Sequence, residues 1–107
     1  MLQLEKSIHW KNLQQLALQY RDIHLRELFT REGNRFETYS IELPNLLLDY
    51  SKNCLTPEIM QALFGLAEDM GLGAATERMY RGAKINVTED RAVLHTALRN
   101  RSNSPVY

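Results

Sequence analysis

Apolar residues recur every three to four positions in five stretches of the chain, which is the spacing of one buried helical face. Ser7, Thr56 and Thr88 stand where helix N-caps are expected, and Pro57 follows Thr56 at a first helical position, where proline is favoured. Glycines that stop helices follow three of these stretches, at Gly33, Gly71 and Gly82. The helices predicted in this way span residues 8–20, 25–31, 57–70, 74–80 and 88–98.

Between Arg35 and Leu43 the period changes from helical spacing to two. Apolar positions then alternate with polar ones, which predicts a half-buried strand. Pro44–Asn45 turns the chain, and Leu46–Tyr50 forms a second strand that is apolar enough for burial on both of its faces. The short connection favours an antiparallel hairpin. The predicted fold class is therefore α+β, mostly helical with one β-hairpin.

Composition narrows the class of protein without indicating any chemistry. A chain of 107 residues has room for one domain, which would bury about 65% of its unfolded surface. Thirteen basic and thirteen acidic residues cancel, so there is no electrostatic reason to expect nucleic acid or an anionic membrane as a partner. The single Cys54 excludes an intramolecular disulfide and suits a reducing cytoplasm. No apolar run approaches the ~18 residues of a membrane span.

No metal or cofactor site is predicted from the sequence. His9, His24 and His95 are widely separated, and with one cysteine they cannot form a zinc motif. His9, beside the first helical face, is expected to be solvated. The chain contains no glycine-rich phosphate loop and no nucleophile elbow. Its methionines in helical stretches are interpreted as core residues.

Three polar clusters are candidate sites, and each has a simpler structural interpretation. The first cluster suggests either a binding site or a strand end solvated by its own side chains, and the second is favoured. Its residues are Asp49, Ser51, Lys52 and Asn53. Glu89, Asp90 and His95 suggest an acid–base group, but a helix capped by Thr88 does not bring them around one reacting atom. The third cluster, Ser102–Asn103–Ser104, suggests an anion site or a solvated helix end.

Three long segments resemble one enzyme family. They are LLLDYSKNCLTPEIMQAL (residues 46–63), GAATERMYRGAKIN (residues 73–86) and NVTEDRAVLHTALRNRSN (residues 86–103). In sequence, order and spacing they resemble the N-terminal part of glucose-6-phosphate isomerase, also called phosphoglucose isomerase. The resemblance covers almost the whole chain.

The resemblance implies a larger αβα enzyme of the sugar-isomerase (SIS-like) type, which interconverts glucose 6-phosphate and fructose 6-phosphate in glycolysis and gluconeogenesis. In the family a glutamate base moves the proton between C1 and C2, and a histidine, a lysine, an arginine and phosphate-binding loops assist. None of these motifs falls on a residue of this chain. The resemblance therefore implies no catalytic, cofactor-binding or metal-binding residue here. It also implies that the parent enzyme is cytoplasmic and homodimeric, with no cofactor.

Two classes of function remain open at the level of sequence. In the first, residues 1–107 are a single N-terminal segment of the isomerase, ending before the first sugar-phosphate-binding subdomain and inactive alone. In the second, the chain is a free-standing helical module that binds another protein. The tail, residues 103–107, favours the first, because the family continues there into its sugar-phosphate-binding region. Arg91 is expected to be structural, anchoring the helix over residues 88–98 or a neighbouring carbonyl.

The remainder of the isomerase chain is the expected partner of this segment. The sequence carries more apolar faces than so few elements can cover among themselves: the stripes of Trp10 and Phe64, both sides of Leu46–Leu48, and the Val93–Leu98 face. Large exposed apolar patches usually find a partner. We therefore expect the isolated chain to self-associate.

Overall fold

The structure is a computed structural model and describes residues 3–99 and residue 101. Its elements are η1 (Leu4–Lys6), α1 (Ile8–Tyr20), α2 (Leu25–Arg31), α3 (Arg35–Thr38), β1 (Ser40–Leu43), β2 (Leu46–Asp49), α4 (Pro57–Asp69), α5 (Leu72–Tyr80) and η2 (His95–Arg99), where η denotes a 3-10 helix. Strands β1 and β2 form an antiparallel hairpin. The prediction of a mostly helical α+β chain with one hairpin is confirmed.

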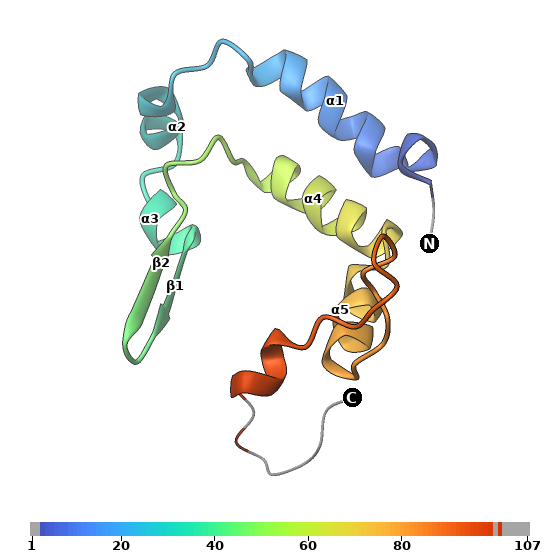
Figure 1. Cartoon of the computed structure of the whole chain (residues 1–107). Helices are drawn as coiled ribbons and strands as arrows, with labels where there is room; N and C mark the ends of the chain where they lie inside the picture. The colour runs from blue at the N-terminus through green and yellow to red at the C-terminus, as the bar shows by residue number, and fades with distance from the viewer. Residues whose placement is uncertain (1–2, 100, 102–107) are drawn as a thin grey trace.

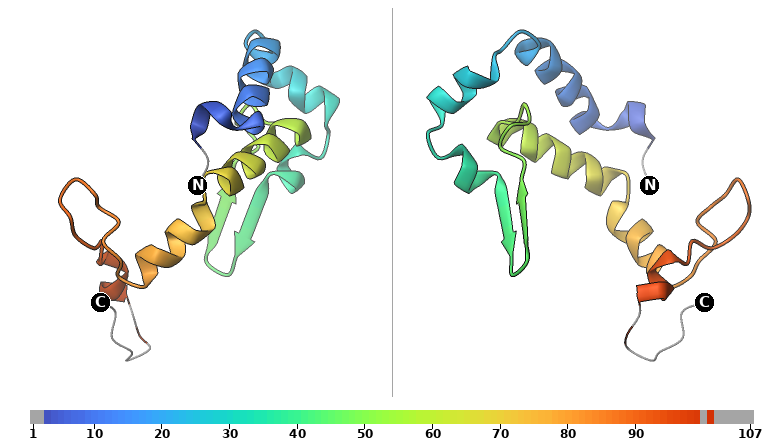
Figure 2. Two further views of the ribbon diagram at one scale, coloured as in Figure 1. Left: turned by 90° about the vertical axis from the view of Figure 1, so that its right-hand side faces the viewer. Right: turned by 60° about the vertical axis from the view of Figure 1, so that its left-hand side comes forward.

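Helices α1 and α4 lie side by side, and residues at their ends cap and join them (Figures 1 and 2). The Ser7 Oγ accepts a hydrogen bond from the Trp10 N–H and donates one of 2.6 Å to Asp69 Oδ2, at the end of α4. The Thr56 Oγ1 accepts from the Ile59 N–H at 3.2 Å and caps the start of α4. Two of the three predicted caps are therefore confirmed, and the first of them, Ser7, also links two helices.

The contact between α1 and α4 depends on a glycine. Leu16 of α1 and Ala62 of α4 are buried in the described part of the chain. One turn beyond Ala62, a Cβ atom at Gly65 would overlap the imidazole of His9. The prediction that His9 is solvated is wrong, because its half-buried ring fills the space above this glycine.

The hairpin extends away from the helices, and its strands are exposed (Figure 1). Its apolar side chains, from Ile41 to Leu48, are between 50% and 62% exposed. The expected half-burial of the first strand and the burial of Leu46–Leu48 on both faces are therefore wrong within this chain. The physical reason is that no other described element covers either face of the two strands.

Two element boundaries differ from the sequence prediction. Residues 35–38, expected in the strand, form the helical turn α3, closed by hydrogen bonds from the N–H of Thr38 to Asn34 and from that of Tyr39 to Arg35. This turn carries the Arg35 side chain inward, and that burial outweighs the local strand pattern. Residues 72–73, expected in a linker, belong to α5, because Gly71 alone makes the turn with a positive φ of 68°.

The helix predicted over residues 88–98 is wrong. Residues 87–90 instead form a turn closed by a bridge between Asn86 and Arg91, and only His95–Arg99 is helical, as η2. The side-chain oxygen of Asn86 accepts from the Glu89 N–H at 3.3 Å. Asparagine side chains that bond nearby backbone in this way compete with helix formation. A short helix also needs tertiary packing, and Leu98 is 90% exposed.

The whole chain is open rather than compact. Its radius of gyration is 18.2 Å, whereas a compact domain of this length has about 13 Å. The hairpin and the α5 region project from the α1–α4 pair as two separate arms (Figures 1 and 2). Among the described residues, no helix is long and apolar enough to cross a membrane.

Candidate functional site

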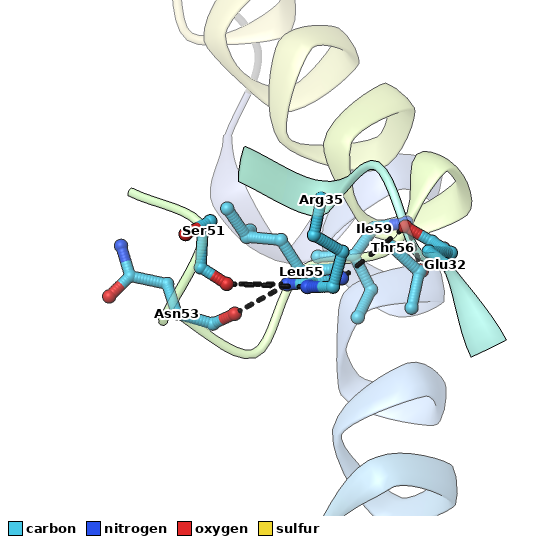
Figure 3. Close-up of polar contacts among 7 residues, drawn as sticks. All are labelled: Glu32, Arg35, Ser51, Asn53, Leu55, Thr56 and Ile59. Atoms are coloured by element: carbon cyan, nitrogen blue, oxygen red, sulfur yellow. Dashed lines mark hydrogen bonds and ion pairs between the residues drawn. The ribbon is translucent and has the colours of Figure 1, made fainter. Parts of the chain in front are cut away.

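The best-defined polar site lies where α3 meets the loop between β2 and α4, and we call it the Arg35 cage. The Arg35 side chain is fully buried. Its guanidinium donates to the carbonyl oxygens of Ser51 (3.0 and 3.3 Å), Asn53 (3.0 Å) and Leu55 (2.7 Å) (Figure 3). The carboxylate of Glu32 completes the cage at 3.4 Å. One side chain thus holds the backbone of a whole loop.

Aromatic rings enclose the guanidinium. Its central carbon lies 5.4 Å from the ring centre of Phe29 and 4.7 Å from that of Tyr39. Such cation–π contacts stabilise a desolvated cation by about 2 kcal/mol or more. A guanidinium has five N–H donors, and the cage engages Nε, Nη1 and Nη2 with protein oxygens. Arg35 is therefore a structural cation, with no donor directed at an external phosphate or carboxylate.

The predicted polar cluster at residues 49–53 belongs to the same loop and bonds mostly within it. Asp49 Oδ1 accepts from the Ser51 N–H at 3.0 Å and from its Oγ at 2.6 Å. The Ser51 hydroxyl and amide hold the pKa of the Asp49 carboxyl below its usual range. Carbonyls of the cluster bind Arg35, as described above. These bonds favour a strand end whose polar groups bond to one another, and they do not favour a binding site.

The Asp49 turn is expected to make the chain sensitive to acid. The pKa of the Asp49 carboxyl is lower in the folded chain than in the unfolded chain, where it is about 3.9. The carboxylate therefore contributes its full stabilisation at pH values above the unfolded-state pKa. This stabilisation is lost as the pH falls through the lower folded pKa. Asp49→Asn should lower the urea midpoint at pH 7 and have a smaller effect near pH 3. An equal effect at both pH values would contradict this assignment.

Tyr39 is the most unusual titratable group at the cage. Its ring is buried and packs edge-on against Tyr50, with ring centres 5.8 Å apart. Its hydroxyl has no hydrogen-bond partner within the described structure. Burial, followed by the negative charge of Glu32, raises the pKa of this phenol, so the group stays neutral at physiological pH. It has the properties of a packing residue and not those of an acid–base catalyst.

The structure does not assemble Glu89, Asp90 and His95 into one site. The Glu89 carboxylate pairs with Arg91 Nε at 2.7 Å, and that of Asp90 pairs with Lys84 at 3.5 Å. All four of these side chains are more than half exposed. Arg91, expected to anchor a helix or a neighbouring carbonyl, instead makes this surface pair with Glu89. Exposed pairs of this kind contribute about 0–1 kcal/mol.

The remaining candidates show no chemical grouping either. His24 caps α2 by accepting from the Arg26 N–H at 3.1 Å, and Cys54 is an exposed free thiol. In the described ranges, no three residues of the metal-ligating types lie together. Open grooves of about 470 and 430 Å³ flank α1, the first lined largely by amides and the second mostly by apolar groups beside Cys54. Ser102–Asn103–Ser104 and residues 103–107 lie outside the described residues.

Sequence reasoning missed the most connected residue, Arg35, and placed it on a strand. The sequence holds one weak signal. The loop from Ser51 to Leu55 joins a strand to a capped helix, and Leu55 is its one aliphatic residue that could anchor it. Such a loop needs donors for its carbonyls. The sequence does not indicate which of thirteen basic residues supplies them.

Comparison with known proteins gives a consistent result. The family model described as phosphoglucose isomerase matches residues 49–107. Glucose-6-phosphate isomerase 1 of Colwellia psychrerythraea is 51% identical over 94 residues, and those of Pseudoalteromonas translucida and Methylococcus capsulatus are 43% and 46% identical over 97 residues. These matches cover 88–91% of this chain but only 17–18% of each relative. The chain thus spans less than a fifth of the length of these relatives.

Proposed function

Because the chain belongs to the phosphoglucose isomerase family, we propose that it forms the N-terminal structural part of a glucose-6-phosphate isomerase. The complete enzyme would interconvert glucose 6-phosphate and fructose 6-phosphate in glycolysis and gluconeogenesis. The observation that carries the proposal is the match of about nine-tenths of this chain to isomerases several times longer. The alternative of a free-standing interaction module is not favoured, since the matched relatives are named as isomerases.

In this proposal residues 1–107 are a single segment that precedes the first sugar-phosphate-binding subdomain of an αβα, SIS-like enzyme. The partner of the segment is the remainder of that polypeptide, and the complete enzyme is a cytoplasmic homodimer. The open shape of the chain supports this view. So does the exposed hairpin, which has the apolar surface of a part that packs against a larger body.

The polar geometry supports a structural role for the segment. Aldose–ketose isomerisation requires a base within hydrogen-bond reach of the transferred proton. The carboxylates described above are engaged with neighbouring groups: Asp69 with Ser7, Asp49 with Ser51 and Glu89 with Arg91. Arg35 is likewise committed to backbone carbonyls. These groups order the segment, and the chemistry is assigned to the remainder of the enzyme.

The proposal predicts that the 107-residue chain does not catalyse the reaction by itself. Purified chain, mixed with fructose 6-phosphate and a coupling dehydrogenase that consumes glucose 6-phosphate, should show no turnover above buffer. The Colwellia enzyme serves as the positive control under the same conditions. Clear turnover by the chain would place catalytic groups within these 107 residues.

A further inference from the structure

Strand β2 has the sequence of a central strand but lies at the edge of its sheet. Its residues Leu46, Leu47 and Leu48 are apolar on both faces, a pattern typical of strands that are covered on both sides and paired on both edges. Strand β1 instead alternates apolar and polar residues. In the part of the chain that the structure describes, the sheet contains these two strands alone.

The outer edge of β2 presents backbone N–H and C=O groups to which a further strand could bond. The Tyr50 N–H donates to the Tyr39 carbonyl at 2.9 Å, which marks a hydrogen-bonded pair next to the ladder. Such pairs alternate along an antiparallel ladder. Leu48, opposite Ile41, therefore turns its N–H and C=O toward β1, whereas Leu47 turns its own toward the open edge.

Apart from the short length of β2, which has four residues, this edge lacks most of the features with which proteins block strand addition. Leu46–Asp49 contains no lysine, arginine or proline and no bulge. Its single charge, on Asp49, accepts hydrogen bonds from Ser51. A two-stranded sheet is also marginal in water, whereas three or more strands with a hydrophobic face can be stable.

We propose that β2 pairs through this open edge with β2 of a second copy of the chain. The product is a four-stranded antiparallel sheet around a twofold axis, in the order β1–β2 followed by β2–β1 of the partner. The pairing concerns the chain as a separate protein and does not rest on the proposed function. It assigns a surface to the self-association expected from the sequence.

The register that fits the sequence is centred on Leu47. Leu47 then exchanges both backbone hydrogen bonds with the partner's Leu47, and Leu46 lies opposite the partner's Leu48. Asp49 lies opposite the partner's Asn45, so no like charges meet. Residues opposite one another share a face of the sheet. The apolar face of each hairpin, formed by Ile41, Leu43, Leu46 and Leu48, therefore continues across the axis.

The chain as a whole exposes more surface than a compact monomer of its mass. The chain exposes 8821 Å², whereas a compact monomer of its mass exposes about 6,200 Å². The nine residues outside the described ranges account for at most about 1,500 Å² of the difference in any conformation. The remaining excess, about 1,100 Å², belongs to the open chain as a whole and not to β2 alone; each partner buries roughly 800 Å² in a standard stable interface.

The test is the mass of the 107-residue chain in solution, measured by light scattering behind a sizing column at tens of micromolar. We expect a dimer of about 25 kDa, twice the 12.5 kDa of one chain. Leu47→Lys places two ammonium groups opposite each other at the axis, and like charges directly opposite are destabilising. It should raise the dissociation constant of the dimer at least about tenfold. Leu47→Pro should do the same by removing the outward N–H.

Leu43→Lys is the matched control. Leu43 is 54% exposed and Leu47 is 53% exposed, but Leu43 lies on β1, away from the axis. Its substitution should leave the dimer intact, and circular dichroism should show that all three variants keep their helices. A monomeric parent chain would overturn the proposal. So would a dimer that survives both Leu47 variants or that is lost in Leu43→Lys, because its partner would then lie on another surface.

Discussion

Arg35→Met is expected to lower the free energy of unfolding by about 3–5 kcal/mol, because three carbonyl groups, one in a buried hydrogen bond and two in part-buried ones, lose their donor. Each unpaired buried polar group costs about 1–3 kcal/mol, and the carbonyls of Ser51, Asn53 and Leu55 all lose their donor. Methionine keeps the apolar length of the side chain, so the effect isolates the guanidinium. This loss is a large part of the roughly 5–15 kcal/mol by which small domains are stable. The loop from β2 to α4 should open first, because it is the segment that loses these contacts.

Two further substitutions make the measurement specific. Arg35→Lys keeps the charge but lacks the planar fork that reaches several carbonyls at once, so its loss should be intermediate. Arg31→Met removes an exposed pair with Glu27 and should cost no more than about 0.5 kcal/mol. Urea unfolding followed by circular dichroism would measure all three. If Arg35→Met cost no more than Arg31→Met, the cage would not hold the loop.

The parts of the fold that the sequence predicted are those specified by local signals. Ser7 and Thr56 cap helices within one turn of themselves, and the apolar stripe of α4 continues to the stop at Gly71. The turn at Pro44–Asn45 lies between two apolar runs, so the hairpin and its register were also predictable. In each case the interactions join residues that are close in sequence.

The parts that were missed depend on residues distant in sequence or on partners outside the chain. Arg35 bonds to residues 16–20 positions away, and no local pattern indicates such contacts. The helix expected over 88–98 had a predicted cap and a periodic face, but the described structure covers that face only in part and leaves Leu98 90% exposed. The same is true of β2, whose apolar residues predict burial that this chain alone does not provide.

The kcat of a chimeric enzyme that carries this segment is expected to stay close to that of the parent, whereas an enzyme without the segment is expected to lose its activity. In the chimera, the matched 94-residue stretch of the Colwellia glucose-6-phosphate isomerase, 51% identical, is replaced by the corresponding part of this chain. A structural segment with no catalytic group should leave kcat within about tenfold of the parent, a change of about 1.4 kcal/mol in the barrier. The same enzyme without the stretch should lose its fold, because the faces that the segment covers become exposed.

The most direct measurement is therefore the kcat of this chimera for fructose 6-phosphate, determined together with its melting temperature and that of the truncated enzyme. The account predicts a chimera that folds and turns over substrate at close to the parental rate, and a truncated enzyme that does neither. A chimera that melts like the parent but has lost turnover by several orders of magnitude would contradict it, since the segment would then carry catalytic groups. A truncated enzyme that stays folded and active would contradict it as well.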